Sequence, residues 1–151
     1  MPLRRFPRAV PRYDRLQQRA EAPVPMNIRF SILPDTYGLV RLPHGTPVPA
    51  WAFAAPGFSS VTCTDAEVSI ACPDASVPAD AQAERGWRVV KMHGPFAFDQ
   101  VGILSSFITP LAERGVVIVA ISTFDTDYVL VKATQLDQAL DALRAAGHSR
   151  V

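Results

Sequence analysis

The chain has 151 residues, of which 48% are hydrophobic and 19% are charged, and its formal net charge is +1. This composition is typical of a globular protein and excludes wholesale disorder. The longest unbroken aliphatic run, residues 116–121, is too short to cross a bilayer, and no basic stripe marks a nucleic-acid surface. We therefore expect neither a membrane nor a nucleic-acid partner, and the lack of a secretory h-region predicts a cytoplasmic location.

Residues 1–25 differ from the rest of the chain. They hold six arginines and five prolines and show almost no aliphatic periodicity. A segment of this kind buries too little apolar surface to order itself, so we predict a flexible tail. Met26 opens the first strand-like run and is an alternative start of translation.

Residues 26–84 predict a small α+β half with reduced helices. Apolar alternation and turn residues predict four strands, at 28–33, 37–42, 59–64 and 67–72. The proline-rich segment between the second and third strands permits at most a short helix over 50–54, and a second short helix is predicted over 79–84. This half is therefore degenerate in its helices.

Residues 85–148 predict a complete half in the order β-α-β-β-α. The strands are expected at 87–92, 116–121 and 128–131. Between the first two strands, apolar residues recur with a helical period from Leu104 to Leu111, which predicts a helix that Gly115 ends. Thr134 is the expected N-cap of the final helix. Pro110 lies inside the first helix and should weaken or kink it, because its ring removes the hydrogen bond to the Ser106 carbonyl.

Two stretches of the chain match each other without a gap at a spacing of 60 residues. Residues 61–71 and 121–131 each contain an apolar strand end, a polar turn, an acidic pair and an alternating strand. This register pairs Glu67 with Asp127. It predicts two copies of one α+β unit, with the functional site where the copies meet.

Three segments of the second half, 98–104, 110–116 and 121–131, resemble an ACT domain. More narrowly, the chain resembles the small stand-alone bacterial proteins with tandem ACT-like halves, and the ACT segments of the CASTOR arginine sensors. The resemblance covers residues 26–148. It implies two ferredoxin-like βαββα halves packed together, the first degenerate, and a regulatory or sensor protein that binds a free amino acid between ACT units.

The resemblance also implies the residues of the ligand site. Gly102 and Ile103 match the loop-to-helix position that touches the ligand backbone. Thr123, Phe124 and Asp127 match the sensor turn, and Ser60 and Val61 are the candidates from the facing half. The chain departs from the family pattern because it ends without the last strand of an ACT unit, and residues 28–33 are expected to supply that strand.

Elementary chemistry agrees with such a site. Free N–H groups at a helix start suit a carboxylate, and the Asp127 carboxylate suits an ammonium or a cationic side chain. The alternative is that Asp125 and Asp127 only bond their own turn. Cys63 and Cys72 fit no metal or redox spacing, so no cofactor is expected.

Two other functions stay open at this point. One is a ligand-free oligomerisation module in which exposed sheet edges pair, as in a homodimer. The other is a small enzyme with His93 and Cys63 as a nucleophile pair, although the chain has no G-x-S-x-G, P-loop or H-E-x-x-H motif. A regulatory output would require a protein partner that the sequence does not identify.

Overall fold

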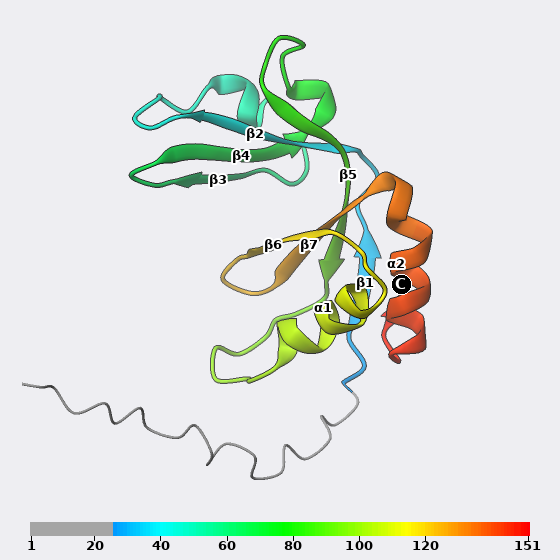
Figure 1. The fold of residues 1–151 in the computed structure, drawn as a ribbon. Coiled ribbons are helices and arrows are strands. Elements are labelled where there is room, and N and C mark those ends of the chain that lie inside the picture. The colour runs from blue at the N-terminus through cyan, green and yellow to red at the C-terminus, as the bar shows by residue number, and fades with distance from the viewer. Residues whose placement is uncertain (1–25) are drawn as a thin grey trace, which may run out of the picture.

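The computed structural model describes residues 26–151, so the tail predicted over residues 1–25 lies outside the described residues. The fold is α+β (Figure 1), and residues 26–151 form eight strands and two α-helices. The strands are β1 (Arg29–Ile32), β2 (Tyr37–Pro43), β3 (Ser60–Cys63), β4 (Glu67–Pro73), β5 (Ala83–Met92), β6 (Ile118–Ser122), β7 (Asp127–Lys132) and β8 (Ser149–Arg150). The helices are α1 (Ile103–Glu113) and α2 (Leu136–Ala145), with short 3-10 helices η1 (Ala50–Phe53), η2 (Asp74–Ser76) and η3 (Ala133–Gln135).

The long strand β5 belongs to both halves of the molecule. Its first residues pair with β2, which gives the first half the strand order β3-β4-β2-β5. Its last residues pair with β1 and β7, which gives the second half the order β6-β7-β5-β1. The two orders correspond strand for strand, and all of these pairings are antiparallel, as in a ferredoxin-like unit. The predicted fold class is therefore confirmed.

Strand β1 completes the second half although it precedes the first half in the chain. Phe30 pairs with Met92 of β5, and the two-residue strand β8 adds to the other edge of β1 in parallel. The prediction that residues 28–33 supply the missing strand is confirmed. The second half is therefore completed by a strand from the start of the described chain, and the first half is completed by β5, which the two halves share.

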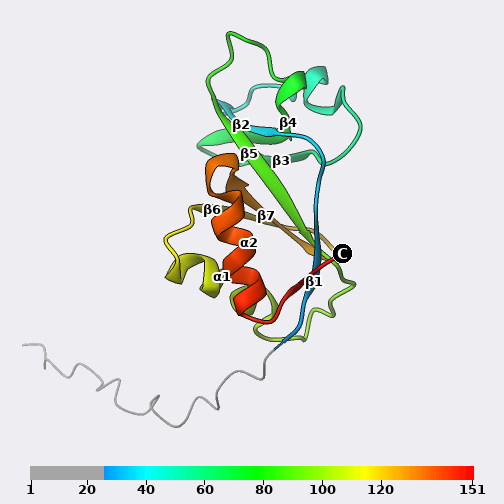
Figure 2. The same cartoon turned by 90° about the vertical axis from the view of Figure 1, so that its right-hand side faces the viewer.

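The second half has the larger core, because both α-helices pack on one face of its strands (Figure 2). Phe107 and Leu111, from the predicted apolar stripe, are fully buried, and Phe30 meets the Phe107 ring edge-on with 5.6 Å between centroids. The first half has a smaller core around Val40 and Ile70. A third cluster, which includes Tyr37, Trp87 and Leu130, joins the two halves.

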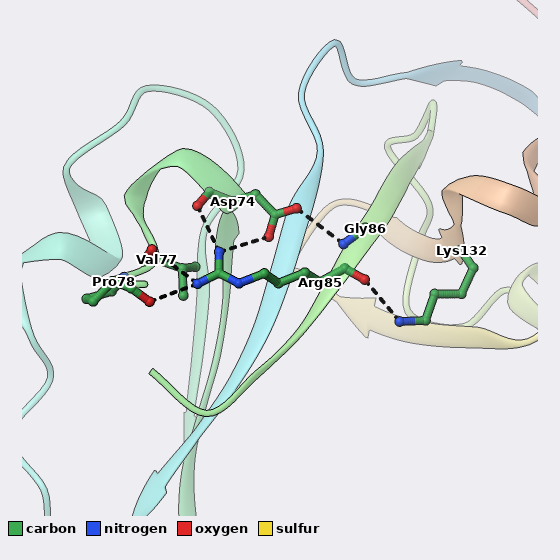
Figure 3. A network of polar contacts seen from close by, with 6 residues as sticks. All are labelled: Asp74, Val77, Pro78, Arg85, Gly86 and Lys132. Atoms are coloured by element: carbon green, nitrogen blue, oxygen red, sulfur yellow. Dashed lines mark hydrogen bonds and ion pairs between the residues drawn. The ribbon is translucent and has the colours of Figure 1, made fainter. Parts of the chain in front are cut away.

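The loop before β5 corrects one predicted element. Residues 79–84 do not form a helix, because β5 already begins at Ala83 and the short helix η2 lies earlier in the chain. The Arg85 guanidinium donates to the carbonyls of Asp74, Val77 and Pro78 and holds this loop in an irregular path (Figure 3). Arg85 itself lies just after the predicted helix, in β5.

Thr134 is not the N-cap of the last helix. It lies inside η3, which runs directly into α2, and no side chain caps either helix. The one-turn 3-10 helix places the start of helical backbone at Ala133, ahead of the threonine.

Pro110 is accommodated by a distant histidine. The Ser106 carbonyl, which Pro110 leaves without its helical donor, accepts a hydrogen bond from the buried His148 Nε2 at 3.1 Å. The Nδ1 atom of the same ring accepts from the Ile28 N–H at 3.2 Å. Helix α1 therefore continues through Pro110 to Glu113.

The turns of the β3–β4 and β6–β7 hairpins show that the predicted register between the halves is wrong by one residue. Thr64 N–H donates to the Glu67 carbonyl, and Thr123 N–H donates to the Thr126 carbonyl in the same way. The equivalent threonines are 59 residues apart, one fewer than the predicted spacing of 60. Glu67 therefore corresponds to Thr126, and no acidic residue of the first half corresponds to Asp127.

Candidate functional site

A cavity of about 310 Å³ lies in the second half, between the loop that enters α1 and the turn that joins β6 to β7. Five of the seven predicted site residues line it together: Gly102, Ile103, Thr123, Phe124 and Asp127. The remaining lining residues are Phe96, Ala97, Phe98, Gln100, Leu104, Ser105, Ser122, Asp125 and Thr126. The cavity is thus built from two segments that are about 20 residues apart in the chain.

One wall of the cavity is the N-terminus of α1. Gly102 precedes the helix with a φ of 88°, in the left-handed region that favours glycine. No side chain caps the helix, and the Ser105 hydroxyl donates to the Gly102 carbonyl instead of accepting an N–H. Because the first N–H groups of a helix have no intrahelical acceptor, those of Ile103 and Leu104 are free to bind an anion.

The opposite wall is the β6–β7 turn, which is held in one conformation. The backbone N–H and the hydroxyl of Thr123 both donate to the Thr126 carbonyl at 2.8 Å. Thr126 is buried, and its hydroxyl donates to the Met92 carbonyl at 2.6 Å, which ties the turn to β5.

Gly94 allows the loop between β5 and α1 to pack closely against this turn. The Phe96 N–H donates to the Asp125 carbonyl at 2.9 Å. A Cβ atom on Gly94 would lie 2.4 Å from that same carbonyl oxygen, so only glycine allows the two segments to approach. The cavity therefore has two walls that are fixed to each other.

Asp127 supplies the charge on the second wall. It is half-buried at the start of β7, and one carboxylate oxygen accepts a hydrogen bond from the Ser122 hydroxyl across the hairpin. Asp125 is the other ionisable residue of the lining, which contains no lysine, arginine or histidine. The site therefore combines an anion-binding helix terminus with carboxylates that suit a cation.

The rim of the cavity is apolar and exposed. Phe98 and Phe124 are 79% and 78% exposed, and their rings meet edge-on with 5.0 Å between centroids. Val101, between the lining residues Gln100 and Gly102 in the loop that enters α1, is 92% exposed. Aromatic faces at a rim attract apolar side chains and organic cations.

Ser60 and Val61 lie away from this cavity. Both belong to β3, the edge strand of the first half, and neither lines it. Within one chain the predicted ligand contacts from the facing half are therefore not brought to Asp127. The roles of Gly94 and Ser122 were missed, and only the Gly94-Pro95 pair, a turn signal, pointed to that segment.

The structure separates the residues of the proposed nucleophile pair. His93 Nε2 lies 2.9 Å from the Ser31 hydroxyl, at the end of β5, whereas Cys63 is exposed on β3 in the first half. Among residues 26–151, no group of acidic, histidine and cysteine side chains is arranged to hold a metal ion. No helix in the described part of the chain has the length and apolarity to span a membrane.

The sequence matches proteins of known family. The ACT-domain family model matches residues 82–145, and a second model, described as an N-terminal domain, matches residues 35–80. The cytosolic arginine sensor for mTORC1 subunit 1 of Mus musculus is 31% identical over 110 residues, which are 72% of this chain and 33% of the sensor. The Rattus norvegicus protein of the same name is 33% identical over 104 residues, or 68% and 31% of the two chains. The match thus spans about a third of the length of these relatives.

Solved structures share the fold. A crystal structure of a protein from Agrobacterium tumefaciens is 43% identical, with a TM-score of 0.79 over 83% of this chain and 93% of that one. A protein of unknown function from Vibrio cholerae, 16% identical, superposes with a TM-score of 0.66 over 80% and 91% of the chains. The regulatory subunit of aspartate kinase from Thermus thermophilus, 14% identical, superposes with a TM-score of 0.53 over 74% of this chain and 93% of that one. The last two show the fold alone.

The chain therefore belongs to the ACT-domain family. Within that family its sequence is similar to the cytosolic arginine sensors, which agrees with the predicted resemblance.

Proposed function

We propose that this protein binds a free amino acid in the cavity between α1 and the β6–β7 turn, and that it acts as a regulatory or sensor protein. The observation that carries the proposal is the pairing of an uncapped helix N-terminus with the Asp127 carboxylate across one small cavity. An amino acid carries both complementary charges a few ångströms apart. Its α-carboxylate binds the N–H groups of Ile103 and Leu104, and its cationic group binds Asp127.

The charges of the lining favour a basic amino acid. The ionisable lining residues are Asp125 and Asp127, with no cationic side chain to balance them. A ligand with one ammonium leaves this pair undercompensated, whereas arginine brings a second positive group that can also lie over the Phe124 ring. The curated relatives are by name arginine sensors, so arginine is the first ligand to test.

The location of the site refines the interface hypothesis. Every lining residue of this cavity comes from the second half, so Ser60 and Val61 contribute only if two chains pair. A homodimer and a separate protein partner therefore remain proposals. A ligand-free interaction module is the second candidate function, and the exposed Phe98, Val101 and Phe124 beside the cavity favour it.

A thermal-shift screen against the common amino acids tests the proposal. At about a hundred times its dissociation constant, a bound ligand adds roughly 2.7 kcal/mol to the free energy of unfolding. In a protein of this size that corresponds to a rise of roughly 5–10 °C in Tm. We expect arginine to produce this rise in the native protein and not in Asp127→Asn, whose unliganded Tm stays close to the native value.

Asp65→Asn is the matched control. Asp65 is an exposed acid in the corresponding turn of the first half, so its replacement changes net charge equally and should leave the arginine shift intact. If no amino acid shifts any of the three proteins, the interaction-module function replaces the sensor function. If Asp127→Asn itself lowers the unliganded Tm by several degrees, Asp127 is a turn residue.

A further inference from the structure

A second cavity, of about 460 Å³, lies where the two halves of the chain meet. It is lined from five places: the β1–β2 connection, the start of β2, the segment before β3, and strands β5 and β7. Three of its lining residues are aromatic, namely Tyr37, Phe58 and Tyr128, and two are charged, namely Asp35 and Lys91. Cavities of several hundred cubic ångströms at a junction between units are typical small-molecule sites.

From this combination we propose that the cavity between the halves is a second ligand site, for a zwitterion with a flat apolar side chain. The site is separate from the proposed amino-acid cavity beside α1, and the two share no lining residue.

The aromatic residues form a fixed wall. Phe58 lies against Tyr128 with 4.5 Å between ring centroids, and it meets Tyr37 at 6.1 Å and 67°. Tyr37 is buried in the cluster that joins the halves, so its ring cannot rotate away. Burial, with the nearby negative charge of Asp35, raises the pKa of the Tyr37 hydroxyl. A flat apolar group packs on such a wall without first ordering it.

The charged residues are of opposite sign and are not paired. Asp35 lies in the exposed β1–β2 connection and Lys91 is half-buried on β5. In the part of the chain that the structure describes, neither side chain makes an ion pair, and no hydrogen bond to either one is found. The carboxylate and the ammonium are therefore too far apart to bind each other. A ligand that carries both charges can bind both residues at once, with its carboxylate at Lys91 and its ammonium at Asp35.

Strand β7 separates the two cavities. Successive side chains of a strand point to opposite faces of the sheet. Val129 packs with the helices, which places Asp127 on the helix face. Leu130 packs in the cluster between the halves, which places Tyr128 on the other face. A substitution on one face therefore tests one cavity without removing a side chain from the other.

The experiment is a calorimetric titration of the full chain with three probes that share a phenyl ring. L-Phenylalanine carries both charges, phenethylamine lacks the carboxylate, and 3-phenylpropanoate lacks the ammonium. We expect L-phenylalanine to bind about tenfold more tightly than either single-charge probe. Lys91→Met should weaken L-phenylalanine about tenfold and leave phenethylamine unchanged. Asp35→Asn should weaken L-phenylalanine similarly and leave 3-phenylpropanoate unchanged.

Asp127→Asn is the control for the other cavity and should leave all three affinities unchanged. The proposal is overturned if the three probes bind equally, if none binds, or if Lys91→Met and Asp35→Asn both leave L-phenylalanine binding intact. It is also overturned if Asp127→Asn removes L-phenylalanine binding, because the ligand would then occupy the cavity beside α1. Asp35→Asn replaces an exposed side chain by one of equal size, so it decides the question even if Lys91→Met does not fold.

Discussion

The two halves of this protein have the same strand order but unequal helices, and the candidate amino-acid site lies in the half with full helices. In the second half, α1 supplies Phe107 and Leu111 to the core and an uncapped N-terminus to the cavity. At the corresponding place the first half has η1, a four-residue 3-10 helix that follows Pro49. A helix this short has little macrodipole and few free N–H groups.

The comparison shows that an ACT-like sheet alone does not make the site. Both hairpins have the same threonine turn, yet only the second turn faces a helix terminus and is followed by an acidic residue at Asp127. The first half instead completes the fold, because β5 and the aromatic cluster around Tyr37 hold both halves together. We infer that the first half is a structural partner of the second.

The largest expected effect comes from removing the first half. A fragment of residues 85–151 lacks β1, which lies between β5 and β8, and loses the buried Ile28 and Phe30 from the main core. We expect the fragment to show no cooperative thermal transition by circular dichroism, whereas residues 26–151 melt cooperatively. A monomeric fragment with a sharp transition would show that the second half folds alone.

A smaller effect is expected from the contact between His148 and α1. His148→Phe leaves the Ile28 N–H and the Ser106 carbonyl without partners and should cost about 1–3 kcal/mol of unfolding free energy in urea titrations. In a Pro110→Ala background, the new N–H of residue 110 can bind the Ser106 carbonyl. The same substitution should then cost about 1 kcal/mol less. Equal costs in the two backgrounds would mean that the histidine does not compensate for the proline.

Gly94→Ala should affect binding more than stability. The added Cβ displaces the Asp125 carbonyl and separates the two walls of the candidate site, at a cost of about 1–3 kcal/mol for overpacking. We expect the variant to remain folded at room temperature and to bind arginine at least tenfold more weakly in calorimetry. Gly45→Ala, in an open first-half turn with a φ of 76°, is the reference for backbone strain without a clash. Unchanged arginine affinity in Gly94→Ala would show that the close approach of Gly94 to the Asp125 carbonyl is not needed for binding.

Local patterns in the sequence predicted most of the fold. The helical stripe through Phe107 and Leu111 and the alternation of β4 and β7 each reflect one buried face, which periodicity detects. Resemblance to a family, and not periodicity, pointed to the five residues that line the cavity. Neither source could find His148 beside Ser106, because the two residues are 42 apart in sequence and the other partner of the ring, Ile28, is 120 residues away.

The errors have physical causes. The register between the halves was wrong by one residue because apolar spacing was matched, whereas the hydrogen bonds of Thr64 and Thr123 determine the equivalent positions. The predicted helix at 79–84 did not form because β5 already begins at Ala83, and Arg85 of that strand binds the carbonyls of Asp74, Val77 and Pro78 just before the segment. Both errors arise where a specific polar contact overrides a weak local preference.

Amide NMR spectra recorded during an arginine titration test the central claim most directly, because they observe the N–H groups that the ligand should bind. The account predicts that the largest shift changes occur at Ile103, Leu104 and the turn 123–127, that turn 64–67 of the first half does not change, and that Asp127→Asn abolishes the response. Shift changes centred on Ser60 and Val61, or none at saturating arginine and lysine, would contradict the assignment of the site to the second half.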